Sequence, residues 1–376
     1  MFKLNFFPLG NADCYRIDLC ETGKKILIDY AHCKSGEDGE DCRVDLAKEL
    51  RHDLAAADRQ DYDVVAFTHA DTDHVRGAAD FFYFDHAAAY QSEDRIKIRE
   101  LWVPAAMIIE EGLDGDDRVI RQEARHRLRR GYGIRVFSRP ELLREWLEKE
   151  GLSVEARRHL ITDAGNLVPG FSLGTDGLEF FVHSPFAHRD GDVLQDRNSG
   201  SLFFQATFCV EGVQTRFILG ADTPHECLSE IVQISKYHGN EIRLQWDVLK
   251  LPHHCSYLSL SDEKGKEETI PVPEVAWLLE QGQQGGIIVS TSDPINSIET
   301  VQPPHFQAAN AYRRCARKIG GEFLVTMEHP TRKAPRSLVI RIDVSGATVQ
   351  KDLNIGAVGV ITRPHRERAR DGCELL

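Results

Sequence analysis

Apolar residues near the start of the chain come in short runs separated by polar turns. These runs cover Leu4–Phe7, Cys14–Leu19, Lys25–Asp29 and Val64–Phe67, and a helical pattern at Asp45–Ala57 precedes the last of them. Short apolar runs bounded by turn residues are typical of β-strands. The first part of the chain, residues 1–75, is therefore predicted to be rich in strands.

Residues 76–165 show helical spacing instead. Within Glu141–Glu150 the apolar side chains recur at intervals of one helical turn, and Arg121–Arg130 reads as a basic helix that ends at Gly131. The stretch is long for a connection between two strand-rich parts. We predict that 76–165 is a mainly helical insertion, or cap.

The rest of the chain returns to strands. The predicted strands are Leu178–His183, Leu202–Val210, Gln214–Leu219, Val248–Leu251, Gly286–Ser290, Glu322–Met327 and Ser337–Ile342, with a helix at Phe306–Ile319. Two sets of strands with interspersed helices indicate an α/β protein. We predict one domain over residues 1–345, and a C-terminal extension over 346–376 that is partly mobile.

Composition narrows the class of protein. The chain has 376 residues, 41% hydrophobic and 28% charged, as in soluble globular proteins. No apolar run approaches the roughly 20 residues that span a bilayer, and no signal-cleavage pattern follows the first strand, so we expect a cytoplasmic protein without membrane insertion. Nine cysteines without a regular framework indicate reduced thiols. A net charge of −13 argues against strong nonspecific binding to duplex DNA.

Candidate chemistry begins directly after the strand Val64–Phe67. The next residues read His-Ala-Asp-Thr-Asp-His, so that His69, Asp71, Asp73 and His74 are closely spaced. A strand directs side chains to alternate faces, whereas a tight loop can aim several at one point. Imidazole and carboxylate together suit a divalent cation. The alternative is a polar loop in which Asp73 caps the following helix.

Later segments supply further ligands of the same types. An apolar run ends at Asp222, and a second run ends at the paired His253 and His254. Ligands at strand ends gather at one edge of a sheet. The order of these segments is compatible with a site for two metal ions.

The loop from His69 to His74 resembles the signature His-x-His-x-Asp-His of the metallo-β-lactamase superfamily, with Asp71 in the place of the second histidine. This variant resembles the hydrolase domain of ComEC-like DNA-uptake proteins. Weaker similarities follow in the same order, namely Leu9–Asp13, Lys25–Asp29, Asn198–Leu202, Leu219–Asp222, Leu249–Ser256 (with Cys255 replacing a glycine) and Pro304–Phe306.

The resemblance implies a four-layer αββα sandwich and two divalent metal ions, Mn²⁺ or Zn²⁺, with Mg²⁺ as a further choice. The first ion would take His69, Asp71 and a later histidine, for which His183 and His188 are candidates. The second would take Asp73, His74 and a late histidine, with Asp222 bridging. His254 is preferred there because it lies two residues before a serine, and His253 would orient a ligand.

The resemblance also indicates the chemistry. A hard carboxylate at Asp71 favours Mn²⁺ or Mg²⁺ relative to Zn²⁺. A hydroxide between two ions is the expected nucleophile, and a phosphodiester is a suitable substrate. Expected substrate contacts or catalytic groups besides Asp73 and His253 are Lys250, His305, Asn198 and Ser201, and the basic helix would bring Arg125 and Arg129 to a phosphate backbone.

The leading hypothesis is a metal-dependent phosphodiesterase or nuclease that acts on nucleic acid. One alternative is a hydrolase of small or cyclic nucleotides. Another is an ester or lactam hydrolase, which would usually keep the histidine that Asp71 replaces. A third is a regulatory or binding subunit with a degenerate metal site. A protein partner is compatible with the acidic composition, and the sequence leaves the oligomeric state open.

Overall fold

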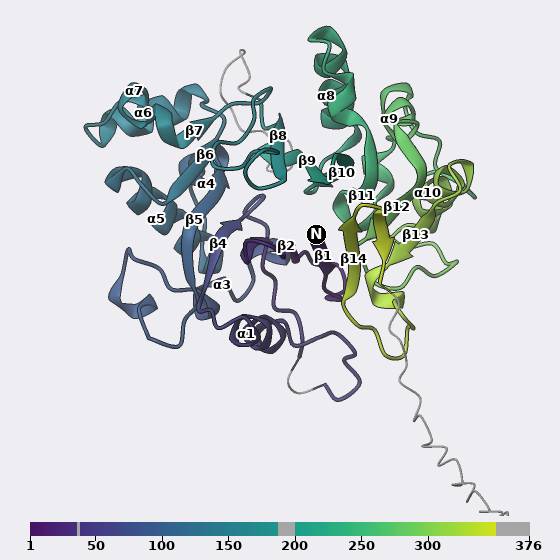
Figure 1. Cartoon of the computed structure of the whole chain (residues 1–376), viewed down its shortest axis with the longest axis horizontal. Helices are drawn as coiled ribbons and strands as arrows, with labels where there is room; N and C mark the ends of the chain where they lie inside the picture. The colour runs from purple at the N-terminus through teal and green to yellow at the C-terminus, as the bar shows by residue number, and fades with distance from the viewer. Residues whose placement is uncertain (36–37, 187–199, 351–376) are drawn as a thin grey trace, which may run out of the picture.

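Two β-sheets pack face to face, and helices cover the outer face of each (Figure 1). The computed structural model describes residues 1–35, 38–186 and 200–350. In these residues the order of layers is helix, sheet, sheet, helix. The predicted α/β class and four-layer αββα sandwich are therefore confirmed.

The first sheet has nine strands in the order β15-β14-β1-β2-β3-β4-β5-β6-β7. Their bounds are β1 Phe2–Phe6, β2 Tyr15–Leu19, β3 Lys24–Ile28, β4 Asp61–Ala66, β5 Lys97–Pro104, β6 Ile134–Phe137, β7 Ile161–Thr162, β14 Leu338–Asp343 and β15 Gly346–Val349. Strands β3 to β7 run parallel to one another, so their carboxyl ends share one edge. The C-terminal extension predicted from residue 346 thus begins with a strand of this sheet, and residues 351–376 lie outside the described part.

The second sheet has six strands in the order β13-β12-β11-β10-β9-β8. Their bounds are β8 Leu178–Ser184, β9 Phe203–Val210, β10 Val213–Gly220, β11 Trp246–Lys250, β12 Gly282–Ser290 and β13 Glu322–Val325. Strands β10 to β13 are parallel, which places the ends of β10 and β11 at one edge.

The two-residue repeat of the strands divides their side chains between two cores. In β4, Val64 and Ala66 face the second sheet, whereas Val65 faces the helices outside. In β12, Ile287 faces the first sheet and Ile288 the outer helices. Because both faces of these strands are buried, the sequence shows continuous apolar runs there.

The outer layers consist of helices with one apolar face. The first sheet carries α1 Leu46–Ala56, α2 Thr72–Val75, α3 Ala78–Phe81, α4 Ala105–Ile109, α5 Gly115–Arg130, α6 Glu141–Lys149 and α7 Val154–Arg157; the second carries α8 His225–Tyr237, α9 Pro273–Leu279 and α10 Phe306–Lys318. Helix α1 begins after Asp45, whose carboxylate accepts the Lys48 amide N–H, and buries its Leu46, Leu50 and Leu54. Capping and the apolar stripe together explain why this segment is helical.

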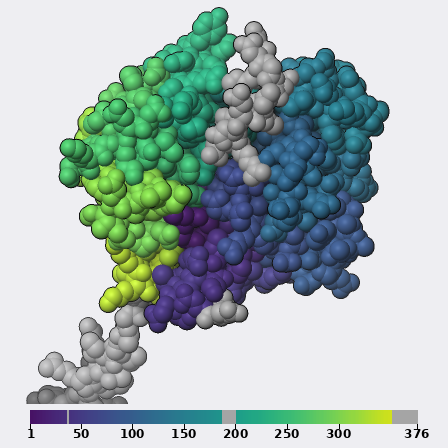
Figure 2. All heavy atoms as spheres, turned by 180° about the vertical axis from the view of Figure 1, so that it is seen from behind, coloured from purple at the N-terminus to yellow at the C-terminus, as the bar shows by residue number. Residues whose placement is uncertain are grey.

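Short 3₁₀ turns connect several of these elements. They are η1 Ala88–Tyr90, η2 Arg158–Leu160, η4 Glu241–Leu244, η5 His253–Cys255, η6 Tyr257–Ser259 and η7 Thr326–Glu328. From behind, residues 200–330 and residues 60–180 form the two sides of the molecule, with the N-terminal strands between them (Figure 2). No described helix is long and apolar enough to cross a membrane.

Residues 76–165 differ from the predicted cap. They contribute the strands β5, β6 and β7, which extend the first sheet, and the helices α4, α5 and α6 lie in its outer layer. The helical periodicity was read correctly, but Leu101 and Val103 of β5 lie in a run that the sequence analysis left unassigned. These helices bury their apolar faces against the sheet, which is why they do not form a separate layer over the site.

One buried ion pair in this outer layer predicts a dependence of stability on pH. Glu123 of α5 accepts bonds from His86 (ring Nδ1, 3.0 Å) and from Arg127 Nε (2.6 Å). Burial alone raises the pKa of Glu123, but the bond from His86 and the charge of Arg127 outweigh it and lower the pKa to about 2.

We expect Glu123 to contribute about 2 to 3 kcal/mol of stability above pH 4.5, and to lose it as the pH falls towards 2. The pKa of the carboxylate is lower in the folded state than in the unfolded state, so the unfolded chain takes up the proton first as the pH falls. Urea unfolding of wild type and Glu123→Gln between pH 2.5 and 7 measures this. The gap between the two proteins should shrink with acidification; a constant gap contradicts the assignment.

Candidate metal centre

Four side chains from distant parts of the sequence converge at the edge where both sheets end. Ligand atoms of Asp73, His74, Asp222 and His254 all lie within 4.8 Å of one another. Asp73 and His74 follow β4 of the first sheet, whereas Asp222 and His254 follow β10 and β11 of the second. All except Asp73 are buried. The sequence analysis placed these same residues at one ion, and the structure brings them together.

His74 is held in one orientation by Asp29 at the end of β3. Its Nδ1–H donates to Asp29 Oδ2 over 2.8 Å, and Asp29 also accepts the amide N–H of Thr68 (2.8 Å) and its hydroxyl (2.7 Å). A carboxylate behind an imidazole fixes the tautomer and directs Nε2 forward, as behind many metal-bound histidines. The role of Asp29 was not predicted, although an apolar strand that ends in an acid was a visible signal.

His254 is held by the backbone. Its Nδ1–H donates to the Thr291 carbonyl over 2.7 Å. His253, His254 and Cys255 all have positive φ, at 48°, 49° and 66°. Non-glycine residues adopt this conformation at a cost, and such strain concentrates at functional sites. The backbone of Cys255 is therefore in the left-handed region that favours glycine.

The facing atoms of the cluster require a positive charge. Because both imidazoles use Nδ1–H elsewhere, each Nε2 points at carboxylates: His254 Nε2 lies 3.0 Å from Asp73 Oδ2, and His74 Nε2 lies 3.3 Å from Asp222 Oδ1. His74 Nε2 and Asp222 Oδ1 are both buried without a hydrogen bond. A proton on each imidazole or a bound cation resolves the opposition of lone pairs, and the donor set suits a divalent metal.

The pKa values follow the same opposition. Burial lowers the pKa of His74, but the carboxylates of Asp29 and Asp222 outweigh it and raise the pKa well above its usual value. Burial likewise lowers and Asp222 raises the pKa of His254, with a net rise. Burial raises the pKa of Asp73, but the bond with His254 and the charge of His74 bring it down to about 2. These shifts favour protonated imidazoles beside ionised carboxylates. A bound metal ion would supply the same positive charge in place of the two protons.

His69 and Asp71 form a second pair beside the cluster. Their Nε2 and Oδ2 atoms are 3.5 Å apart, and the ring centroid of His69 is 4.0 Å from that of His74. His69 Nε2 is buried without a hydrogen bond. His253 Nε2 lies 3.7 Å from Asp222 Oδ2 and is partly exposed, so it borders the cluster from the other sheet. His69 and Asp71, which were predicted as ligands of the first ion, thus lie next to the four residues predicted for the second ion.

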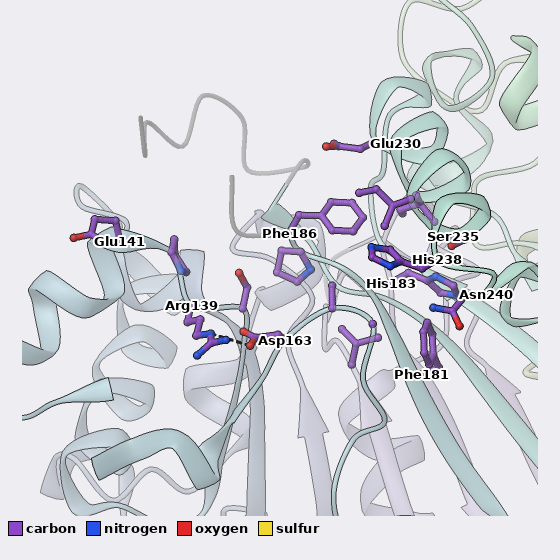
Figure 3. A pocket seen from close by; sticks show the side chains of 18 residues that line it. Arg139, Glu141, Asp163, Phe181, His183, Phe186, Glu230, Ser235, His238 and Asn240 are labelled. Carbon is purple, nitrogen blue, oxygen red and sulfur yellow. Dashed lines mark ion pairs between the residues drawn. The ribbon is translucent and has the colours of Figure 1, made fainter. Parts of the chain in front are cut away.

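His183 is not part of this arrangement. It is buried on β8, and its Nε2–H donates to the Arg243 carbonyl over 2.9 Å. Burial lowers its pKa to about 4, so the ring is neutral at physiological pH. It lines a separate cavity of about 1170 Å³ between β8 and α8, where Arg139 pairs with Asp163 at 2.8 Å (Figure 3). None of the four clustered residues lines that cavity. The other candidate, His188, lies outside the described residues.

Lys250 is not available to a substrate. Its side chain is fully buried; its ammonium pairs with Asp13 and donates to the Gly220 carbonyl over 3.0 Å. Burial raises the pKa of Asp13, but the charge of Lys250 outweighs it and leaves the pKa lowered. The sequence placed Lys250 correctly at a strand end. The direction of its side chain, into the interior under the cluster, was set by packing.

His305 is also occupied by the fold. Its Nδ1 accepts the Tyr257 amide N–H over 3.3 Å, and its Nε2–H donates to the Val301 carbonyl over 3.3 Å. Both ring nitrogens are therefore used within the protein. Ser201 is buried, and its carbonyl accepts the Ser184 hydroxyl over 3.1 Å. Asn198 lies outside the described residues.

The two arginines of the basic helix α5 that were predicted to contact a phosphate backbone are instead engaged within the outer helical layer. Arg125 donates to the Ile108 carbonyl (2.8 Å) and pairs with Glu111 at 3.0 Å, while Arg129 pairs with Glu150 through two bonds of 2.6 and 2.9 Å. Both lie over the ring of Trp146 on α6. These arginines tie the outer helices together, which corrects their predicted role as phosphate contacts.

A smaller pocket of about 310 Å³ adjoins the cluster on the outward side of Asp73. We call it the Asp73 pocket. Its polar walls come from Asn11, Arg43, Thr72, Asp73, Arg76 and Asp293. Apart from Asp73, none of these residues was predicted as a site residue, because they come from four separate segments.

The sequence matches no protein-family model and no curated protein. Several solved structures are similar in shape. A metal-dependent hydrolase described as putative, from Parabacteroides distasonis, is 10% identical, with 86% of this chain and 92% of that one covered and a TM-score of 0.36. Unliganded yeast PDE1 is 10% identical, with 86% and 96% covered and a TM-score of 0.42. A class B3 di-zinc metallo-β-lactamase from an Alaskan soil metagenome is 11% identical, with 74% and 89% covered and a TM-score of 0.30.

Proposed function

We propose that this protein is a metal-dependent hydrolase of phosphodiesters. The observation that carries the proposal is the cluster of Asp73, His74, Asp222 and His254, whose ligand atoms lie within 4.8 Å of one another at the joint edge of both sheets. Divalent ions held there lower the pKa of water and stabilise negative charge on phosphoryl oxygens.

The protein residues have distinct roles in this proposal. Asp73, His74, Asp222 and His254 would hold one ion, and His69 and Asp71 would contribute to a second. Asp29 and the Thr291 carbonyl orient the two imidazoles. His253 is partly exposed beside Asp222, where it can take up or deliver a proton near the reacting group.

A phosphodiester suits this set of donors better than an ester or lactam. Three carboxylates, Asp71, Asp73 and Asp222, make the centre hard and anionic, which favours oxygen-preferring ions. Such ions are well matched to a substrate whose difficulty is accumulated negative charge.

Two observations favour a short substrate over a long polymer. Arg125 and Arg129 are paired within the outer helical layer, so they do not form a basic track. The pocket next to Asp73, at about 310 Å³, is at the small end of ligand sites. We therefore favour nucleotides or short oligonucleotides, with nucleic acid polymers as the second candidate.

The test is hydrolysis by purified protein of bis(p-nitrophenyl) phosphate, dinucleotides, and labelled single- and double-stranded DNA. Each is assayed with Mn²⁺, Mg²⁺, Zn²⁺ or EDTA. We expect turnover with Mn²⁺ that disappears in EDTA and in Asp73→Ala. The control is Glu148→Ala, because Glu148 is exposed on α6 and belongs to none of the groups of described residues that could hold a metal ion.

Turnover of dinucleotides but not DNA would support the short-substrate proposal. Turnover that survives EDTA would contradict the metal assignment. Failure to cleave any phosphodiester, with metal bound, would contradict the substrate class.

A further inference from the structure

We infer that the Asp73 pocket binds a second anionic group of the substrate, such as the terminal phosphate of a short nucleotide, through Arg76 and Arg43. This inference rests on the proposed function and adds the substrate class to it. The ligand group would lie beside the bond that is cut, and not at it.

The position of the pocket separates it from the metal cluster. Of the four clustered residues only Asp73 lines it. His74, Asp222 and His254 are buried on the inner side. The Asp73 carboxylate therefore lies between a group in the pocket and the reacting centre. A neighbouring group on the same substrate would occupy such a position.

Arg76 provides an unused positive charge. It is exposed, follows α2, and its backbone is fixed because its N–H donates to the Thr72 carbonyl and its carbonyl accepts the His32 N–H over 2.9 Å. Its guanidinium makes no hydrogen bond or ion pair with any residue in the described ranges. Most arginines named above are paired, so a free guanidinium beside an acidic cluster indicates an anionic ligand.

Arg43 is preorganised on the other part of the wall. Its Nε and Nη2 donate to Asp41 over 2.8 and 2.7 Å, and Asp41 is held in turn by the Ser35 amide N–H (2.7 Å). This leaves Nη1 without a hydrogen bond to the described part of the chain. A guanidinium fixed in this way loses little freedom when it binds a ligand.

The pocket is kept open by a glycine. Gly10 has φ of +80°, and a Cβ there would lie 2.9 Å from Asp293 Oδ1 and 3.5 Å from Arg43 Cδ. The Asn11 side chain holds the neighbouring loop, since its amide donates to the Pro303 carbonyl (2.7 Å) and its oxygen accepts the Asp293 N–H (2.9 Å). The Asp293 carboxylate borders the same space and can accept a hydrogen bond from a hydroxyl group. An anion next to a hydroxyl is the chemistry of a sugar phosphate.

The experiment compares two matched substrates, the dinucleotide TpT and its 5′-phosphorylated form pTpT. We expect wild type to have a KM for pTpT about tenfold below that for TpT. Arg76→Gln should raise the KM for pTpT about tenfold, corresponding to about 1.4 kcal/mol, and leave kcat and all constants for TpT within about twofold. Arg76→Lys should keep part of the preference. Arg158→Gln is the control, because Arg158 is 64% exposed and 4.0 Å from its partner Glu155.

Binding is measured independently of turnover. Calorimetric titration of inorganic pyrophosphate into protein freed of metal should show binding by wild type that Arg76→Gln weakens about tenfold. If neither dinucleotide is cleaved, the proposed function fails there, and this titration alone decides the inference. Equal effects of Arg76→Gln on both dinucleotides, or unchanged pyrophosphate binding, would overturn it.

Discussion

Replacement of Asp222 by Asn is expected to remove metal binding at the cluster and to lower the hydrolysis rate by at least about a thousandfold, equivalent to about 4 kcal/mol of transition-state stabilisation. Asp222 lies 3.3 Å from His74, 3.7 Å from His253 and 3.9 Å from His254, counting carboxylate oxygens to Nε2 atoms. Asp222 thus lies close to a histidine that follows a strand of the first sheet and to two that follow a strand of the second. Loss of its charge therefore affects every neighbouring donor at once.

Metal content per chain, measured by mass spectrometry after dialysis against Mn²⁺ or Zn²⁺, accompanies the rate. Glu148→Gln is the conservative control, because Glu148 is exposed on α6 and belongs to none of the groups of described residues that could hold a metal ion. Far-ultraviolet circular dichroism verifies that both variants are folded. An Asp222→Asn protein that kept its metals and its rate would disprove the assignment of this residue.

Replacement of Lys250 by Met is expected to destabilise the protein by about 3 to 5 kcal/mol, because it leaves the Asp13 carboxylate buried without its partner. Both side chains are fully buried, and the ion pair lies under the metal cluster. The free energy of unfolding in urea measures the effect. Lys266→Met provides the control, since Lys266 is an exposed loop residue, and should change stability by less than about 0.5 kcal/mol.

A double variant separates the lost pair from a general packing defect. Asp13→Asn added to Lys250→Met removes the uncompensated charge, so the two changes should cost less together than their sum by about 1 to 3 kcal/mol. Additive effects would show that Lys250 acts through its volume rather than its charge. The same cycle tests the correction of Lys250 from a substrate contact to a structural residue.

The sequence led us to expect a nucleic acid substrate. The Asp73 pocket and the ion-paired arginines of α5 favour a shorter one. A run of arginines in Arg121–Arg130 indicated a basic surface, but ion pairs with Glu111 and Glu150 absorb Arg125 and Arg129. The arginines that line the Asp73 pocket are Arg43, which pairs with Asp41, and Arg76. The arginine content of the helix thus predicted its positive charge, but it did not predict the ion pairs that these arginines form.

Much of the fold follows from local patterns. The strands predicted at Lys25–Asp29, Val64–Phe67 and Gly286–Ser290 appear as β3, β4 and β12 with small shifts at their ends, and the helix predicted after Asp45 appears as α1. Apolar periodicity fixes these elements because burial on one or both faces requires it. The strands β5, β6 and β7 were not predicted, because they lie among the helical segments of residues 76–165 and were included in the predicted cap.

The sequence by itself determined which residues have side chains of metal-ligating type and that they follow strands. Four side chains of ligand type within His69–His74, an acid at Asp222 and a histidine at His254 carry that information in their types and spacing. It did not determine which side chains face the centre. His183, Lys250 and His305 are ligands or catalytic groups by type, yet each has a side-chain nitrogen that is hydrogen-bonded to a backbone carbonyl of the fold.

Only the tertiary structure decided those directions. The core between the sheets brings the ends of β4, β10 and β11 to one edge, so residues far apart in the chain meet as a cluster. The contacts behind that edge, Asp29 to His74 and the Thr291 carbonyl to His254, then select one orientation for each imidazole. Residue types are local properties of the chain, whereas the direction of a buried polar group depends on which partner packing places within hydrogen-bonding distance.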